Sequence, residues 1–324
     1  MYTTVIGNYP KIGPKTRASS LRKAITKYQL NEITESELRQ CENEVTSEII
    51  REQEDIGLDI LTDGHIRWDD PQTFFASRIH GFQINGLIRY FDTNTYYRQP
   101  VAIDKLEWIN PISVNDYQFA ECCSDLPIKV VITGPFTLAK LCQSRYYKNV
   151  DSMAKDLAII LNKEAIALAE AGVPIIQFDE PAILRHKDQI PLFSSLMSVL
   201  LEGVTTRKAL CTYFGGLSGI EDEIFDLPFD IFNLDLVTNG FDLDSLKKFP
   251  VDKSIGLGII DARNVKLESV DEIQSNIYKT CQWVDPEKIQ VSPNCGLEFL
   301  PRSNARSKLR RMVQAVTSVK EMIS

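Results

Sequence analysis

Eight short apolar segments recur along the chain, separated by stretches in which apolar residues have helical spacing. Each segment ends at polar residues or at Gly and Pro, a pattern that favours buried strands of a parallel sheet. Met153, Leu157 and Leu161 show the helical spacing of one intervening stretch. The predicted strands cover residues 3–6, 58–61, 128–132, 173–178, 209–213, 231–237, 254–260 and 288–291.

Eight strands that alternate with helices predict an α/β fold, a single parallel (β/α)₈ TIM barrel of about 250 residues plus insertions. The chain has 324 residues and no repeat, low-complexity segment or Gly/Ser/Pro-rich linker, so we expect one domain over residues 1–324. The excess length lies in residues 71–127, between the second and third strands. Two aromatic-rich, β-prone runs flank turn residues there, which predicts a β-hairpin insertion over one mouth of the barrel.

The composition excludes several classes of protein. The net charge of −8 and the pI near 5.1 argue against a broad surface for nucleic acid or anionic membranes. No segment approaches the ~20 apolar residues of a membrane span, and the first residues lack the pattern of a signal peptide. The seven cysteines are odd in number and show no close CxxC pairing, which argues against a secreted disulfide framework. We therefore expect a cytoplasmic protein.

Polar, ionisable or thiol side chains follow nearly every predicted strand. The carboxyl ends of barrel strands gather around one opening, so these side chains are expected to form one converging active site. They include Asn8, His65, Gly134, Asp179, Glu180, Cys211, Asp235, Asp261 and Cys295.

Three of these residues are candidate zinc ligands. Cys211, Asp235 and Cys295 follow the fifth, sixth and eighth predicted strands. Two thiolates and a carboxylate suit zinc, and an open fourth position would make the site catalytic. The alternative is two buried core thiols and a helix-capping Asp, since no local metal motif links the three residues.

Asp179 and Glu180 are adjacent carboxylates at a strand end, where they can bind a substrate amine or transfer protons. The alternative is a helix start, which favours acidic residues and Pro. A hydrolase that uses this pair is a weaker alternative, because adjacent residues seldom give the ~5–9 Å separation that such chemistry needs. His65 at its strand end is a candidate for substrate binding or proton transfer.

A local basic cluster stands out in the acidic chain. Lys11, Arg17 and Arg22 lie near the N-terminus, on the approach to a predicted helix. These side chains could hold the carboxylates or the polyglutamate tail of an acidic ligand. The alternative is a solvated helix face.

Motifs distributed over nearly the whole chain resemble those of the cobalamin-independent methionine synthase family, in the family's order. The DEPA and NCGL-type motifs are the most specific. The segments that carry the resemblance are VIGNYPKIG, RASSLRKA, GLDILTDG, VVITGPFTLAKL, AGVPIIQFDEPAI, LCTYFGG, FDIFNLDLV, IGLGIIDARNV and VSPNCGLEFLPR.

The resemblance implies a (β/α)₈ barrel, either a single-barrel member or the counterpart of one barrel of a two-barrel enzyme. In the family's catalytic barrel a His two residues before a Cys, a Glu after the sixth strand and a final Cys bind zinc, which holds the homocysteine thiolate. Cys211 and Cys295 match this pattern, Asp235 takes the Glu position and Ala209 takes the His position. The implied zinc site is therefore incomplete.

The activity implied by the resemblance is methyl transfer from methyltetrahydrofolate or a methyl-corrinoid donor to the zinc-bound thiolate of homocysteine, giving methionine. Asp179 would hold the amino group and Asn8 the carboxylate. Asp261 and His65 are the candidate proton donors, although neither matches the family's acid. The alternative is a non-catalytic barrel that binds folate or a partner and supports a separate catalytic chain, because the YPKIG, TYFG, LDLV and DARN segments look more like the family's non-catalytic barrel.

Overall fold

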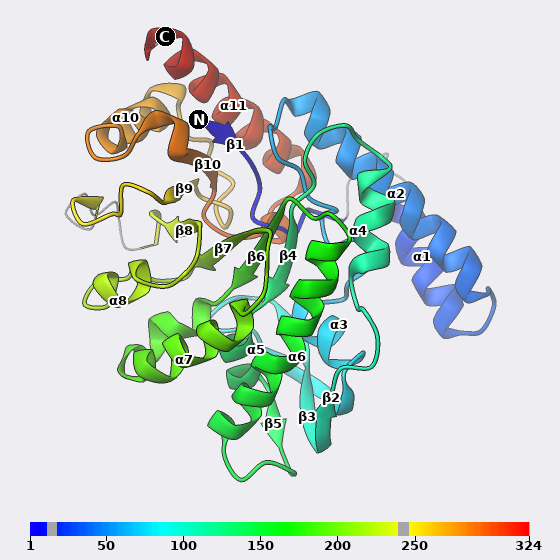
Figure 1. Cartoon of the computed structure of the whole chain (residues 1–324). Helices are drawn as coiled ribbons and strands as arrows, with labels where there is room; N and C mark the ends of the chain where they lie inside the picture. Colours follow the sequence, from blue (N-terminus) through cyan, green and yellow to red (C-terminus); the bar gives the residue numbers. More distant parts are fainter. Residues whose placement is uncertain (12–17, 239–245, 324) are drawn as a thin grey trace. The chain divides into compact units, whose positions relative to one another are not determined.

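The computed structural model describes residues 1–11, 18–238 and 246–323. The chain divides into two compact units. Unit 1 comprises residues 1–67, 116–130 and 234–324, and unit 2 comprises residues 68–115 and 131–233. Each unit contains parallel strands and helices, so the predicted α/β class is confirmed (Figure 1). Among the described helices, none combines the length and hydropathy that crossing a bilayer requires.

The strands of unit 1 follow the order β1–β10–β9–β8, and the β1–β10 and β10–β9 pairs are parallel. Their side chains are almost entirely buried, as expected for strands covered on both faces. The chain passes from unit 2 into unit 1 within β8. The bounds are β1 (Tyr2–Thr3), β8 (Ile231–Asp235), β9 (Ser254–Ile260) and β10 (Ile289–Pro293).

The predicted strand at residues 58–61 is reduced to two isolated parallel bridges, Thr4↔Ile60 and Leu61↔Ile128. The side-chain amide of Gln53 explains why the pairing stops. It accepts from the Thr62 N–H at 3.0 Å and donates to the Thr62 carbonyl at 2.8 Å. These are the backbone groups that a longer strand would have paired with its neighbours. Closure of an eight-stranded barrel therefore stays a prediction.

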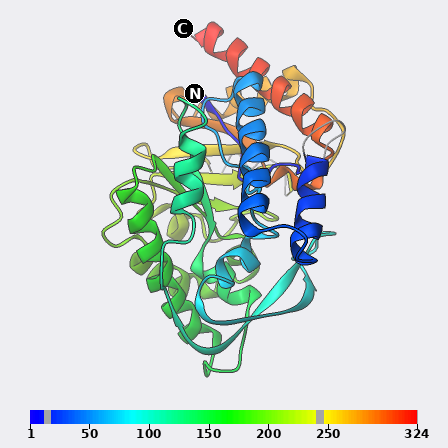
Figure 2. The same ribbon diagram turned by 90° about the vertical axis from the view of Figure 1, so that its right-hand side faces the viewer.

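Unit 1 contains two long helices, α2 and α11. Helix α2 begins at a capping box formed by Thr34 and Glu37 and ends at Gly57 in the left-handed region. Helices α1 and α2 lie side by side, as do α10 and α11 (Figure 2). The bounds are α1 (Ala18–Gln29), α2 (Glu35–Ile56), α4 (Val114–Glu121), α10 (Val270–Thr280), η3 (Pro286–Lys288), η4 (Leu297–Phe299) and α11 (Arg302–Ile323).

Unit 2 contains the strands in the order β7–β6–β4, and helix α6 packs against both α5 and α7 (Figure 1). The predicted helical spacing is confirmed in α6, where Met153, Leu157 and Leu161 are buried. The bounds are α3 (Pro71–Ala76), β4 (Val130–Thr133), α5 (Pro135–Leu141), α6 (Val150–Glu170), β6 (Ile175–Asp179), η1 (Pro181–Arg185), η2 (Lys187–Gln189), α7 (Ile190–Leu201), β7 (Arg207–Thr212) and α8 (Glu221–Phe225).

Unit 2 also contains a separate three-stranded sheet. Strands β2 (His80–Arg89) and β3 (Tyr96–Glu107) pair antiparallel, and β5 (Gln143–Ser144) pairs parallel with β3. The register shifts near Gly81, whose φ of +91° favours glycine. Residues 90–95 connect β2 and β3, so an antiparallel hairpin lies within the segment predicted as an insertion.

Glu164 on α6 anchors the segment that follows β3. Its buried carboxylate accepts hydrogen bonds from the Trp108 indole at 3.0 Å, from the Ile112 and Ser113 amides at 2.8 Å and from the Ser113 hydroxyl at 2.8 Å. Without this acceptor, several buried donors would lose their hydrogen-bond partner, and each loss would cost about 1–3 kcal/mol of stability. Glu164 thus holds the base of the hairpin against α6.

We expect Glu164→Ala to lower the free energy of unfolding by about 3 kcal/mol or more, because it leaves buried donors without an acceptor. Chemical denaturation monitored by tryptophan fluorescence measures the change. Glu170→Ala, at an exposed position on the same helix, is the matched control and should change stability by less than about 0.5 kcal/mol. Equal effects of the two variants would contradict the anchoring role.

Glu180 closes the start of α5. Its fully buried carboxylate accepts from the Phe136 amide at 2.9 Å and the Thr137 amide at 2.7 Å, two of the donors that a helix start leaves unpaired. A side chain at Gly134 would collide with this carboxylate, which accounts for the glycine there. Burial raises the pKa of Glu180 to about 8, against the opposing effect of these hydrogen bonds.

The raised pKa of Glu180 predicts a pH dependence of stability. Between its unfolded value of about 4.3 and its folded value of about 8, the folded state holds a proton that the unfolded chain has lost. The free energy of unfolding therefore falls as the pH rises through this window. Relative to Glu180→Gln, we expect the parent chain to lose at least about 1 kcal/mol between pH 5 and pH 8 in urea denaturation. Parallel profiles for the two proteins would contradict this.

Candidate functional site

Asn294 joins the carboxyl ends of three strands in unit 1. Its amide donates to Asp235 Oδ1 at 3.1 Å, after β8, and accepts from the Ala262 amide at 2.9 Å, after β9. Asn294 itself follows β10 and precedes Cys295, which is buried. The predicted residues Asp235, Asp261 and Cys295 therefore gather at one end of the unit 1 strands.

His65 and Asn8 lie together in unit 1. His65 Nδ1 is 2.6 Å from Asn8 Oδ1, and the Asn8 amide donates to Glu298 Oε1 at 3.1 Å. With its NH₂ group on the Glu298 carboxylate, Asn8 presents an oxygen that only accepts, so His65 Nδ1 is the protonated nitrogen. His65 is buried and has a φ of +52°, an uncommon conformation for a non-glycine residue. The Asn8 contact therefore fixes the orientation and the tautomer of the His65 ring.

The predicted basic cluster is only partly within the described structure. Lys11 is half-buried, and its charge, with that of Arg67, lowers the pKa of Asp63, which burial raises more strongly. Arg22 is exposed on α1. Arg17 lies outside the described residues. Lys11 thus has acidic neighbours, Asp63 and Glu298, near the strand ends.

Asp261 is half-buried directly after β9. Its Oδ1 accepts from the Arg263 amide at 2.9 Å, and its own amide donates to Glu268 at 2.9 Å. Through Oδ1 the carboxylate thus stabilises the turn that follows β9, and within the described residues no backbone amide is seen to donate to Oδ2.

The donor set does not fit the predicted three-ligand zinc site. Asp235 Oδ1 accepts from the Val237 and Thr238 amides, both at 3.0 Å, and from Asn294, while Oδ2 accepts from the Thr238 hydroxyl at 2.6 Å. The carboxylate is therefore committed to capping its own turn, which was the alternative considered for it. In the part of the chain that the structure describes, no three His, Cys, Asp or Glu side chains are grouped as metal ligands.

The two thiols belong to different units. Cys295 is buried in unit 1, where desolvation raises the pKa of its thiol well above the ordinary value. Cys211 is buried at the end of β7 in unit 2, and Ala209 lies in the same strand. Thiols suit zinc, but neither the aspartate nor the alanine supplies the further ligand that the family pattern requires.

Asp179, at the end of β6 in unit 2, has a partly accessible carboxylate. Its Oδ1 accepts from the Gln177 amide at 2.7 Å, and its Oδ2 accepts from the Tyr213 hydroxyl at 3.3 Å. Gln177 in turn accepts from Asn233 at 3.3 Å. A short hydrogen-bonded chain thus runs from β8 through β6 to the end of β7 and holds both oxygens of Asp179.

The adjacent carboxylates of Asp179 and Glu180 therefore differ in environment. Glu180 is buried against the start of α5, as the helix-start alternative predicts, while Asp179 retains accessible surface. A strand end that places alternate side chains on opposite faces accounts for the difference.

Several residues of these clusters were missed in the sequence. Tyr213 and Gln177 hold Asp179, while Asn294 and Glu298 hold Asp235 and Asn8. All four residues lie inside the family-like motifs of the sequence, and the available signal for Tyr213 and Asn294 is their position directly after a strand. The partners of Gln177 and Glu298 depend on tertiary contacts.

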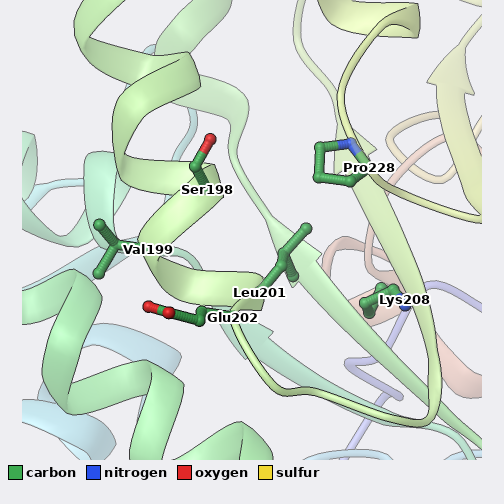
Figure 3. Close-up of a pocket in the computed structure, with 6 residues that line it drawn as sticks. All are labelled: Ser198, Val199, Leu201, Glu202, Lys208 and Pro228. Carbon is green, nitrogen blue, oxygen red and sulfur yellow. The ribbon is translucent and has the colours of Figure 1, made fainter.

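A pocket of about 550 Å³ in unit 2 lies away from these residues (Figure 3). Its lining comes from the C-terminal end of α7 and from Lys208, at the start of β7, whereas Asp179 and Tyr213 lie at the carboxyl ends of their strands. Its carboxylate and hydroxyl, from Glu202 and Ser198, belong to the end of α7 and not to the strand ends. We therefore do not assign the pocket to the candidate site.

Comparison with known proteins identifies the family. A family model described as "Cobalamin-independent synthase, Catalytic domain" matches residues 1–318. The chain is 35% identical over 321 residues to a protein named methionine synthase from Sulfurisphaera tokodaii, covering 98% of this chain and 92% of that protein. A methionine synthase from Pyrococcus furiosus is 33% identical, with coverage of 98% and 93%.

Two solved structures share the fold. A B12-independent methionine synthase from Shewanella sp. W3-18-1, in complex with selenomethionine, has a TM-score of 0.87 and 22% identity over 99% of this chain and 98% of that one. A putative vitamin-B12-independent methionine synthase from Listeria monocytogenes has a TM-score of 0.81 and 20% identity, with 98% of each chain covered. The family model and the curated relatives show that this chain belongs to the cobalamin-independent methionine synthase family, as its motifs predicted.

Proposed function

We propose that this chain is a methyltransferase of the methionine synthase type, which transfers a methyl group to the thiol of homocysteine and gives methionine. The observation that carries the proposal is the match to proteins named methionine synthase over 98% of the chain. The donor is methyltetrahydrofolate or a methyl-corrinoid. The proposal includes the eight-stranded barrel expected from the sequence, because barrel strand ends gather the reacting groups.

We assign the amino group of homocysteine to Asp179. A carboxylate held at both oxygens is oriented before substrate arrives, and a charge-assisted hydrogen bond to an ammonium is among the stronger polar contacts. The Shewanella protein binds selenomethionine, an amino acid that resembles the product, which supports an amino acid ligand for this fold. Glu180 is left out of this assignment because its carboxylate binds the start of α5.

The reaction forms a bond between the homocysteine sulfur and the methyl carbon and breaks the bond between that carbon and N5 of the folate, or the cobalt of a corrinoid. The thiol loses a proton, and a departing folate nitrogen gains one. We assign proton transfer to His65, whose ring is oriented by the hydrogen bond between its Nδ1 and Asn8. Asp261 is the second candidate. A corrinoid donor would need only the first of the two transfers.

Lys11, Arg17 and Arg22 are proposed to attract the acidic groups of the donor or substrate. Asn8 was expected to contact the substrate carboxylate, but its amide and oxygen already bind Glu298 and His65. We therefore propose that Asn8 acts on the substrate through His65.

No step of this proposal uses zinc, because Asp235 caps its own turn and Ala209 replaces the family's His. The same observation favours a second candidate function, a non-catalytic barrel that binds folate or a partner and supports a separate catalytic chain. The two functions differ in turnover by the purified chain and in the effect of changing the thiols.

Asp179→Asn should lower kcat/KM for homocysteine by about 10- to 100-fold, because it removes the charge of the proposed hydrogen bond to the ammonium. Steady-state methylation assays with each donor measure the effect. Asp226→Asn, at an exposed position in unit 2, is the matched control and should keep the parent value. An unchanged kcat/KM for Asp179→Asn would contradict the assignment of the amine.

We expect elemental analysis of the purified chain to find well below one zinc per chain, and we expect Cys211→Ser/Cys295→Ser to leave that content unchanged. Methylation by the metal-free chain would support the proposal. Near-stoichiometric zinc that is lost in the double variant would instead support the zinc-bound thiolate implied by the family pattern. Tight folate or partner binding without turnover would support the non-catalytic function.

A further inference from the structure

The tip of the β2–β3 hairpin, residues 90–92, packs on the loops that follow β6 and β7 in unit 2. The Phe91 ring meets the Phe214 ring at 6.0 Å, and the Arg185 guanidinium lies 5.0 Å from the Phe91 ring. Arg185 also forms an ion pair with Asp92 at 2.5 Å. The hairpin tip is therefore in contact with the segments that flank Asp179.

Unusual backbone conformations occur on both sides of this contact. Phe91 has a φ of +47° and Phe214 a φ of +68°, in the left-handed region that bulky residues rarely adopt. Such conformations cost of order 1–3 kcal/mol each and persist where surrounding contacts impose them. Two of them facing each other indicate that the hairpin tip and the loop after β7 are held in a defined arrangement.

The contact includes a hydrogen-bonded pair of tyrosines. The Tyr90 and Tyr213 hydroxyls are 3.0 Å apart, and the Tyr213 hydroxyl donates to Asp179 Oδ2 at 3.3 Å. A hydroxyl has one proton to donate, so Tyr213 accepts from Tyr90 while it donates to Asp179. The two hydrogen bonds are therefore donated in one direction, from Tyr90 at the hairpin tip to Tyr213 and from Tyr213 to the Asp179 carboxylate. Each hydrogen bond polarises and strengthens the next.

We infer that Tyr90 and Tyr213 are positioning residues that orient Asp179 and thereby make the site select thiols that carry an amino group. The inference rests on the proposed function, in which Asp179 binds the amine of homocysteine. Gln177 holds one carboxylate oxygen and Tyr213 the other, so loss of the Tyr213 hydroxyl removes a hydrogen bond that orients Asp179, and loss of the Tyr90 hydroxyl weakens that bond. Phenylalanine would satisfy the aromatic packing equally well, which leaves orientation as the role of the two hydroxyls.

The test uses Tyr213→Phe and Tyr90→Phe in the full chain, with homocysteine and 4-mercaptobutanoate as substrates. The second thiol has the same chain length and carboxylate but no amine. We expect kcat/KM for homocysteine to fall about tenfold in Tyr213→Phe and less in Tyr90→Phe, while the value for 4-mercaptobutanoate stays the same. Because the two hydroxyls act in series, the double variant should match Tyr213→Phe.

Tyr97→Phe is the matched control. Tyr97 belongs to the same aromatic cluster, with its ring 6.2 Å from that of Tyr90, but its hydroxyl donates to the Leu141 carbonyl at 2.7 Å. This variant should lower the melting temperature without changing the ratio of the two kcat/KM values. An equal loss of kcat/KM for both thiols in Tyr213→Phe would show that the tyrosines act only through packing, and it would overturn the inference.

Binding separates this inference from the proposed function. Calorimetric titration of each thiol into the parent chain and the variants gives the preference for the amine independently of turnover. A parent chain that prefers homocysteine without methylating it would reject the proposed function, and the inference would then stand or fall on whether Tyr213→Phe abolishes that preference. A parent chain with no preference would overturn the inference, even if it methylates homocysteine.

Discussion

Backbone groups at the strand ends must find hydrogen-bond partners, and in this chain polar side chains supply many of them. Buried N–H groups cannot be left unpaired without a cost of about 1–3 kcal/mol each. Glu180 satisfies the start of α5, Glu164 the segment after β3, and Asp235 the turn after β8. This requirement decides which of the many polar residues at the strand ends can contribute to chemistry and which are occupied by structure.

The remaining candidates are themselves held by other side chains. His65 is oriented through Asn8 by Glu298, and Asp179 is oriented by Gln177 and Tyr213. Orientation of this kind is what methyl transfer demands, since the sulfur and the methyl donor must meet in line at near-contact distance. Family membership supports methyl transfer, and we propose these two clusters as its binding and proton-transfer groups. Asp235, which caps its own turn, departs from the zinc pattern of the family.

The β2–β3 hairpin brings residues that are distant in the sequence into contact with the strand ends of unit 2. Its base is bound by Glu164 and its tip contacts the loop after β7, so Tyr90 lies 123 positions from the tyrosine that it meets. Residues on such a connection can alter selection of a substrate without touching the atoms that react.

The sequence by itself determined the alternation of strands and helices, because burial requires apolar runs and helical spacing, and it determined the family through motifs such as DEPA. It also indicated Asp179 and His65, since polar residues directly after apolar strands lie at strand ends. The sequence could not decide that the segment at 58–61 stops after two bridges, because Gln53 takes the Thr62 backbone through a tertiary contact. Nor could it separate Asp179 from Glu180, because both are carboxylates at the same strand end. Only the tertiary structure, which places the first amides of α5 on Glu180, buries one carboxylate and leaves the other accessible.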